Sequence, residues 1–224
     1  MDSKVVNREI KSVIWPLLKA AGFSKFNTRN AWRYTNEQIC VINFQSFNSY
    51  NADVLGVTSF SFSVNVGCYL EYLPPRWPPK VENGRLVPSE TQCDFRSVLV
   101  RSFPQPSHKF DTIWAVDKRG ENLSVCMGDV AKQIPSVVNW FGRLQNKEEV
   151  LSILMNDQAS MHFPGNSPSG IGNNPSPNRS YLAGYAALKL GKEVLAREKF
   201  AEAVNSKCFT HLFSSVEGAI NRAI

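Results

Sequence analysis

Residues 60–70 alternate between two kinds of side chain, and this alternation constrains the fold more than any other feature of the chain. The apolar set is Phe60, Phe62, Val64, Val66, Cys68 and Leu70. The set between them is Ser61, Ser63, Asn65, Gly67 and Tyr69. Successive side chains of an extended strand point to opposite faces, so this strand has one apolar and one polar face. Such a strand is typical of an antiparallel sheet that is covered on one side.

Four other segments predict the rest of the sheet. Residues 31–35 and 38–47 also have a period of two, and they read as a hairpin around Asn36-Glu37. Residues 93–101 and 112–117 supply two further strands. We therefore predict an α+β fold in which helices pack on an antiparallel sheet of about five strands.

The chain before the sheet has the apolar spacing of a helix. Apolar residues recur at helical intervals over residues 5–21, and Asp2 or Ser3 can cap the start of this helix. Gly22 is placed to end it in the left-handed conformation. Pro16 lies inside the run, where a proline kinks or breaks a helix.

Helical spacing returns after Gly120. Pro135 is expected to break this helix, and a second one continues through Leu144. Asn146 precedes Glu149 by three residues, which resembles the capping arrangement at the start of a helix.

The C-terminal piece has the most specific local pattern. Small residues such as Ala183 and Gly184, followed by Phe200, fall where a tetratricopeptide unit places its small and aromatic side chains. Because only one such unit is visible, we expect this hairpin to pack on the main domain. The predicted organisation is an α+β domain (1–156), a linker or long loop rich in Gly, Pro, Ser and Asn (157–178), and a helical hairpin with a final helix over 209–223 (179–224).

Composition and cysteine usage predict a cytoplasmic protein. Apolar residues make up 43% of the chain and charged residues 20%, which is ordinary for a globular protein. The N-terminus lacks the apolar stretch of a signal peptide, and no apolar run is long enough to span a bilayer. The five cysteines show no C-x-x-C pairing, which favours buried free thiols in a reducing compartment.

Motifs in a fixed order along the chain resemble a known family. They are Pro16, Leu17, Gly22 and Phe23, then Trp32 and Tyr34, the FSVNVGCYL strand, a Pro-Pro loop, Cys93–Arg96 and Trp114–Asp117. Over about residues 1–155 this chain resembles the bacterial domain-of-unknown-function family 4304, with the helical hairpin as its tail. The resemblance implies an antiparallel sheet with helices packed on it. By association only, it also suggests the toxin-neutralising immunity proteins of bacterial conflict systems.

Catalytic and metal-binding motifs are missing from the sequence. The histidines at 108, 162 and 211 lie near no Cys or Ser in a recognisable motif, and G-x-S-x-G is absent. There is no H-E-x-x-H and no cysteine pair. We predict no catalytic residue, no metal and no cofactor, although an enzyme of unrecognised type stays an alternative because a triad can be assembled in space.

Basic and aromatic residues interleave near the first hairpin. Lys25, Arg29 and Arg33 alternate with aromatic residues, a combination that binds single-stranded nucleic acid by phosphate contact and stacking. The reading we favour is that Trp32 and Tyr34 face the core while Arg33 faces water. Nucleic acid therefore stays the alternative partner, bound by the basic N-terminal half.

Trp77 lies among the prolines of the segment Pro74–Pro79. A large aromatic on a stiff loop loses little entropy on binding, and interfaces favour Trp and Arg as anchors. The opposite reading, that Trp77 covers an open edge or face of the sheet, is equally well supported. Our leading hypothesis is a non-enzymatic protein-binding module, an immunity-type inhibitor of a toxin whose surface is acidic or neutral. Its predicted binding residues are Trp77, Arg76, Ser61, Ser63, Asn65 and Tyr69.

Overall fold

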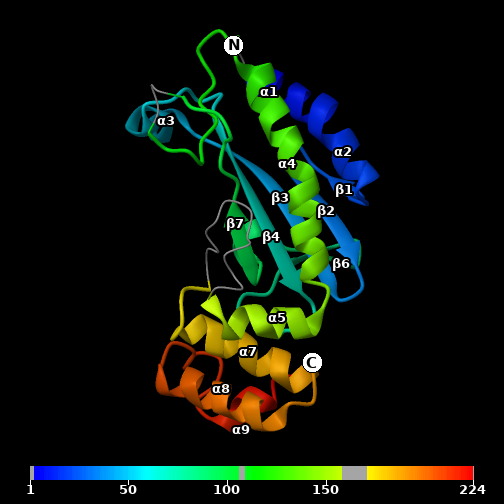
Figure 1. Ribbon diagram of the computed structural model, residues 1–224, viewed down its shortest axis with the longest axis vertical. Coiled ribbons are helices and arrows are strands. Elements are labelled where there is room, and N and C mark those ends of the chain that lie inside the picture. The colour runs from blue at the N-terminus through cyan, green and yellow to red at the C-terminus, as the bar shows by residue number, and fades with distance from the viewer. Residues whose placement is uncertain (1–2, 106–108, 158–170, 224) are drawn as a thin grey trace.

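The computed structural model describes residues 3–105, 109–157 and 171–223. A five-stranded antiparallel sheet runs through its centre with the strand order β1-β2-β3-β4-β7 (Figure 1). The strands are β1 Lys25–Phe26, β2 Asn30–Thr35, β3 Gln38–Ser46, β4 Phe62–Leu70 and β7 Phe95–Val98. The predicted α+β class is confirmed.

The predicted hairpin and the predicted central strand form the middle of this sheet. Strands β2 and β3 pair up to Thr35 opposite Gln38, and the turn between them places Glu37 at a φ of 58°. Strand β3 then pairs with β4 along its whole length, from Gln38 opposite Leu70 to Ser46 opposite Phe62. The edge strand β1, which has only two residues, was not expected from the sequence.

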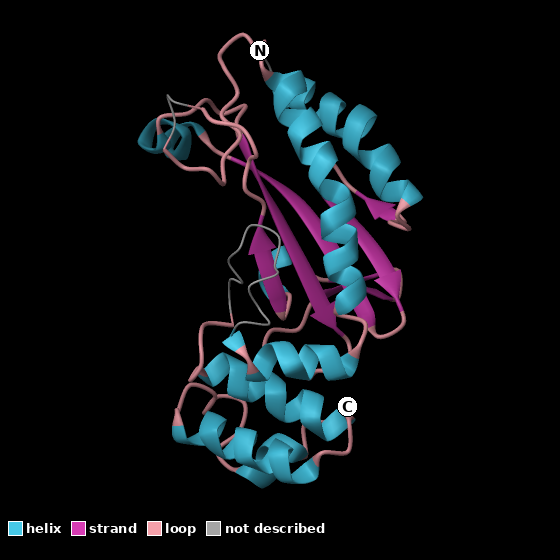
Figure 2. Ribbon diagram, viewed as in Figure 1, coloured by secondary structure: helices cyan, strands magenta, loops and turns pink. Residues whose placement is uncertain are grey.

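Helices cover one face of the sheet (Figure 2). They are α1 Ser3–Glu9, a π-helical turn Ile10–Ile14, α2 Trp15–Ala20 and α4 Leu123–Arg143. The first three are continuous, and Gly22 follows them at a φ of 87°, as predicted. The predicted irregularity is present as the π-turn, which lies directly before the Pro16 turn. The apolar side chains between this layer and the sheet form the main core.

The expected break at Pro135 is absent, because α4 continues through this proline as one helix of 21 residues. Val130, Ile134, Val137 and Phe141 are all buried on the same side of the helix. Packing of this unbroken apolar stripe offsets the roughly 3 kcal/mol that an interior proline costs. Pro135 itself lies on the exposed side.

The expected strand over residues 112–117 is reduced to a single bridge between Trp114 and Phe62. Side chains satisfy the neighbouring backbone groups instead of a partner strand. Gln105 bonds both the N–H and the C=O of Ala115, and the Ser61 hydroxyl accepts the N–H of Val116. Because these groups already have partners, the segment does not extend the ladder.

Residues 71–92, between β4 and β7, contain a second, two-stranded sheet of β5 Lys80–Glu82 and β6 Arg85–Val87 that was not expected from the sequence. Asn83 and Gly84 connect the strands with φ values of 51° and 75°. An Asn-Gly pair with both φ values positive is the preferred two-residue hairpin turn. This hairpin and the segment after it fold over the second face of the main sheet, where Trp32 donates to the carbonyl of Pro88.

The remaining helices are α3 Ser49–Leu55, α5 Lys147–Met155, α7 Pro177–Lys189, α8 Glu193–Asn205 and α9 Val216–Ile220. Asn146 caps α5 as predicted, since its side chain accepts the N–H groups of Glu148 and Glu149. Helices α7 to α9 lie beyond α5 at one end of the sheet (Figure 1). The predicted final helix is shorter than 209–223, and most of the predicted linker lies outside the described residues.

Four of the cysteines are buried and Cys208 is exposed, and all five are free thiols, as the sequence predicted. Within the described part of the chain, no helix combines the length and the apolar character that a membrane crossing requires.

Candidate functional site

The Pro-Trp loop, which we define as residues 74–79, runs along the seam between the sheet and the C-terminal helices. The Tyr181 hydroxyl donates to the carbonyl of Pro74 at 2.7 Å, and the Arg222 guanidinium donates to that of Pro75 at 3.2 Å. On the other side of Trp77, Gln92 donates to the carbonyl of Pro78 at 3.1 Å. The loop is therefore fixed on both sides of its central residue.

Trp77 is a large apolar residue of the Pro-Trp loop whose side chain is exposed to solvent. Its side chain is 63% exposed, and its indole stacks on the His211 ring at 5.6 Å with an interplanar angle of 18°. Val81, at the start of the next strand, is 60% exposed. A rigid, exposed aromatic side chain, followed four residues later by an exposed aliphatic one, offers apolar surface that a protein partner can cover.

Arg76 is held by the molecule itself. Its Nη1 donates to the Asn178 side chain at 3.0 Å, and its charge acts on the nearby carboxyl of Asp94. Burial raises the pKa of Asp94 to about 7, while the Leu70 N–H bond and the Arg76 charge oppose that rise. Arg76 therefore contributes to the junction between the loop and the tail, and less of it is available for a partner than the sequence suggested.

The predicted polar face of β4 is largely covered, which corrects our expectation that its side chains can contact a partner. Ser61 is fully buried, Ser63 is 8% exposed and Tyr69 is 4% exposed. The bridge segment around Val116 lies on Ser61, and Tyr69 packs in a small second core with Trp32, Ile39, Val41 and Cys93. Only Asn65 is half-buried, and its amide donates to the side chains of Asn43 and Gln45.

The three predicted nucleic-acid-binding cations lie apart from one another. Lys25 forms an ion pair with Glu82 at 2.5 Å. Arg33, which we expected in water, is 8% exposed and lies between the rings of Phe23 and Phe141 at 5.7 and 5.6 Å. It shares a strand face with Ala31, and that face points to the main core. Trp32 and Tyr34 point to the second, smaller cluster instead.

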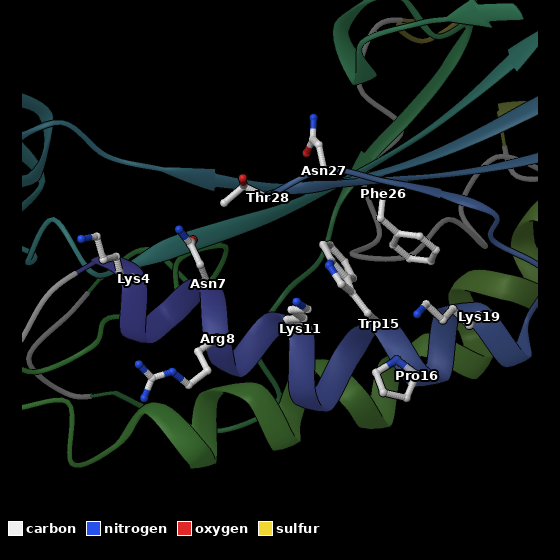
Figure 3. Close-up of a pocket in the computed structure, with 10 residues that line it drawn as sticks. All are labelled: Lys4, Asn7, Arg8, Lys11, Trp15, Pro16, Lys19, Phe26, Asn27 and Thr28. Atoms are coloured by element: carbon white, nitrogen blue, oxygen red, sulfur yellow. The ribbon is translucent and has the colours of Figure 1, made fainter. Parts of the chain in front are cut away.

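A basic groove that the sequence did not single out lies between the first helical segment and the turn after β1 (Figure 3). Its volume is about 640 Å³. The groove is lined by Lys4, Asn7, Arg8, Lys11, Trp15, Pro16, Lys19, Phe26, Asn27 and Thr28. Lys4, Arg8 and Lys11 are spaced by one helical turn and so share a face, a signal that was visible but resembled an ordinary solvated surface.

In the part of the chain that the structure describes, no three His, Cys, Asp or Glu side chains are grouped so that they could hold a metal ion. Two of the three histidines, at positions 108 and 162, lie outside that part. The third, His211, is the ring beneath Trp77.

Comparison with known families decides the classification. The family profile called Domain of unknown function (DUF4304) matches residues 14–143, which is more than half of the chain. This chain belongs to the DUF4304 family. The DUF4304 region includes the sheet, the Pro-Trp loop and α4, while Asn178, Tyr181 and His211 lie beyond it. No curated protein and no solved structure matches the chain.

Proposed function

We propose that this DUF4304 protein is a non-enzymatic binding module that captures a protein partner through Trp77. One observation carries the proposal: a 63% exposed indole lies on a loop whose carbonyls are bonded on both sides of it. Because the loop is ordered before binding, a partner gains the indole contact without having to order the chain. Tryptophan is also among the residues most enriched in binding hot spots.

The residues around Trp77 indicate what kind of partner surface would fit this site. Lys80 and Val81, three and four residues after it, are exposed, and its indole stacks on the His211 ring. Lys80 also pairs with Glu82 at 2.9 Å. The complementary surface would have an apolar pocket for the indole and an acidic or neutral rim. The formal charge of +6 favours the same kind of partner, because opposite charges accelerate association. The finer proposal, that the partner is a toxin and the protein its immunity-type inhibitor, is supported only by the family association.

The test is the affinity of Trp77→Ala for the product of a neighbouring gene, measured by calorimetry against the unchanged protein. We expect a loss of about 2 kcal/mol or more, roughly thirtyfold in Kd, with little change in Tm. Arg76 stays unchanged in this variant because it bonds Asn178.

Tyr50→Ala is the matched control, since Tyr50 is an exposed aromatic residue on α3 with 73% exposure. It should leave the affinity unchanged. If Trp77→Ala lowers Tm by several degrees, the indole is a structural cover for the seam. If neither the affinity nor Tm changes in Trp77→Ala, the binding site lies elsewhere. If no neighbouring gene product binds the unchanged protein, the inhibitor proposal is wrong.

A further inference from the structure

The basic groove differs from the rest of the surface in the balance of its charges. Four of its lining residues are cationic and none is acidic. Elsewhere in the described residues, many cations face a carboxylate, as Arg96 does with Glu90 at 2.7 Å and Arg143 with Glu149 at 2.5 Å. Like charges gathered along one groove produce a positive potential that attracts an anion.

The cations of the groove form a row that is longer than one small anion. Lys4, Arg8 and Lys11 follow one another at successive helical turns, and Lys19 continues the row past Pro16. At a rise of about 1.5 Å per residue, the row from Lys4 to Lys19 covers roughly 22 Å. This length matches an extended polyanion better than a single phosphate or carboxylate.

Aromatic rings form part of the groove between the cations. Figure 3 shows the rings of Trp15 and Phe26 in the space between the helix and the β1–β2 turn. The two rings lie 5.3 Å apart. Trp15 is only 6% exposed and supports the floor, whereas Phe26 is half-buried and has Lys19 Nζ over its ring at 5.7 Å. Aromatic side chains beside cations are the usual platform for unstacked bases.

The groove continues into a second hollow of about 490 Å³ that shares Asn7 and Thr28 with it. The lining of this hollow is rich in hydroxyl and amide groups, contributed by Asn7, Thr28, Arg29, Ser46, Phe47, Asn48, Ser49 and Ser59. The Nη1 atom of Arg29 and the Oδ1 atom of Asn7 are buried there, and neither has a hydrogen-bond partner in the described residues. Burial without a counter-charge also lowers the pKa of Arg29.

From this geometry we propose that the basic groove binds single-stranded nucleic acid, independently of Trp77. The cation row would contact successive phosphates, the amide and hydroxyl groups would bond phosphate or sugar oxygens, and Phe26 would stack a base. An acidic protein segment could also pair with the cations. Unlike a nucleic acid, however, it does not carry a planar base with each negative charge, so it would not stack on the aromatic rings of the groove. Binding of this kind is expected to be weakly dependent on sequence, because phosphate contacts carry no sequence information.

The experiment measures fluorescence anisotropy of a labelled thymidine oligonucleotide of about 12 residues, a typical site size for such proteins. Lys11→Ala with Lys19→Ala should weaken binding by about tenfold or more and reduce the slope of log K against log salt by about 1.4. The control, Lys118→Ala with Lys132→Ala, removes the same charge from exposed positions outside the groove. It should change binding little.

A second variant tests the base contact. Phe26→Leu should weaken oligonucleotide binding by roughly fivefold or more and leave inorganic polyphosphate binding unchanged. Equal losses in the two lysine pairs would show diffuse charge attraction and overturn the site. Polyglutamate of equal charge competing as well as the oligonucleotide would assign the groove to an acidic protein segment. An oligonucleotide that does not bind, or that binds Phe26→Leu as before, would also overturn the proposal.

Discussion

Asp94 places a carboxyl group in the interior, at the end of β4 where the sheet meets the Pro-Trp loop. It is 7% exposed, and its Oδ2 accepts the backbone N–H of Leu70 at 2.9 Å. Burial disfavours the charged form and raises the pKa to about 7, although the Leu70 bond and the Arg76 charge act in the opposite direction. The protein therefore contains a group that changes charge near neutral pH next to its candidate binding loop.

The raised pKa of Asp94 has a consequence for stability. Between pH 4 and pH 7 the folded state holds a proton that the unfolded state, with a pKa near 3.8, has released. The free energy of unfolding should therefore fall as pH rises through this window, by on the order of 4 kcal/mol, and level off above it. Asp94→Asn cannot ionise, so its stability should be flatter with pH in urea-unfolding measurements.

Asp53→Asn provides the comparison, because Asp53 is an exposed aspartate on α3. It should keep the pH profile of the unchanged protein. Identical profiles for all three proteins would mean that Asp94 stays charged in the folded state across this range.

The packing of helix α7 against helix α8 depends on a glycine, which has no side chain, at their contact. Gly184 of α7 lies against the ring of Phe200 of α8, and a Cβ atom at this glycine would be 2.5 Å from Cε1 of the ring. The ring is fully buried and packs edge-on against Tyr185 at 4.7 Å, so it has no space to retreat. The small residue lets the two helices approach closely, which is what the tetratricopeptide-like pattern predicted.

Gly184→Ala should therefore destabilise the protein by about 1–3 kcal/mol, even though alanine is the better helix former. Gly128→Ala in α4 is the matched control, because a Cβ atom there meets nothing within 4 Å. That variant should gain about 1 kcal/mol from helix propensity alone. Chemical denaturation of both variants measures the difference, and equal gains would show that the α7–α8 contact is looser than described.

The sequence predicted well those elements in which the local pattern of side chains alone determines the structure. Residues 60–70 and the Asn36-Glu37 hairpin have alternation and turn chemistry in agreement, and both form as expected. Residues 112–117 have strand composition, but their backbone partners are side chains from distant segments, which no local pattern reveals. The β5–β6 hairpin was predictable from Asn83-Gly84, and it was missed because the prolines before it suggested a plain loop.

The candidate site was less predictable than the fold. The sequence left Trp77 open between an exposed anchor and a cover for the sheet. The side chain is exposed, and its role as an anchor stays a prediction. The burial of Ser61 and Tyr69 depends on which segments cover the second face of the sheet. The alternation of side chains within one strand does not reveal which segments these are. The basic groove depends on bringing the first helix against the turn at Asn27 and Thr28, which is a tertiary contact.

The molecule as a whole has one continuous main core that includes the sheet, the helical layer and the C-terminal helices. Arg179 joins the tail to α5 and is 1% exposed. Its guanidinium donates to the carbonyls of Ile153, Leu154 and Gly172 and pairs with Asp157 at 3.2 Å. The first two carbonyls belong to the last turn of α5, where the helix itself supplies no N–H donors for the carbonyl groups. Burial lowers the pKa of Arg179, and the carboxylate of Asp157 partly compensates.

This junction predicts that the tail stays attached without its covalent connection. A protease site placed within 158–170, outside the described residues, allows the chain to be cut after folding. The two pieces should remain associated in size-exclusion chromatography and melt together, because the interface contains the Tyr181 bond to Pro74, the Arg179 bonds to α5 and a shared apolar core.

Arg179→Leu tests which contact holds the pieces together. The change leaves buried carbonyl groups without a donor, and each such group costs about 1–3 kcal/mol, so the cut variant should dissociate or melt in two steps. Arg197→Leu is the matched control, because Arg197 forms an exposed pair with Glu217, and an exposed pair contributes about 1 kcal/mol or less. If the cut protein of unchanged sequence separates, the tail is a unit joined to the sheet only by the chain. If it stays together and both arginine variants behave alike, the apolar core of the junction is sufficient and Arg179 does not determine how the tail docks.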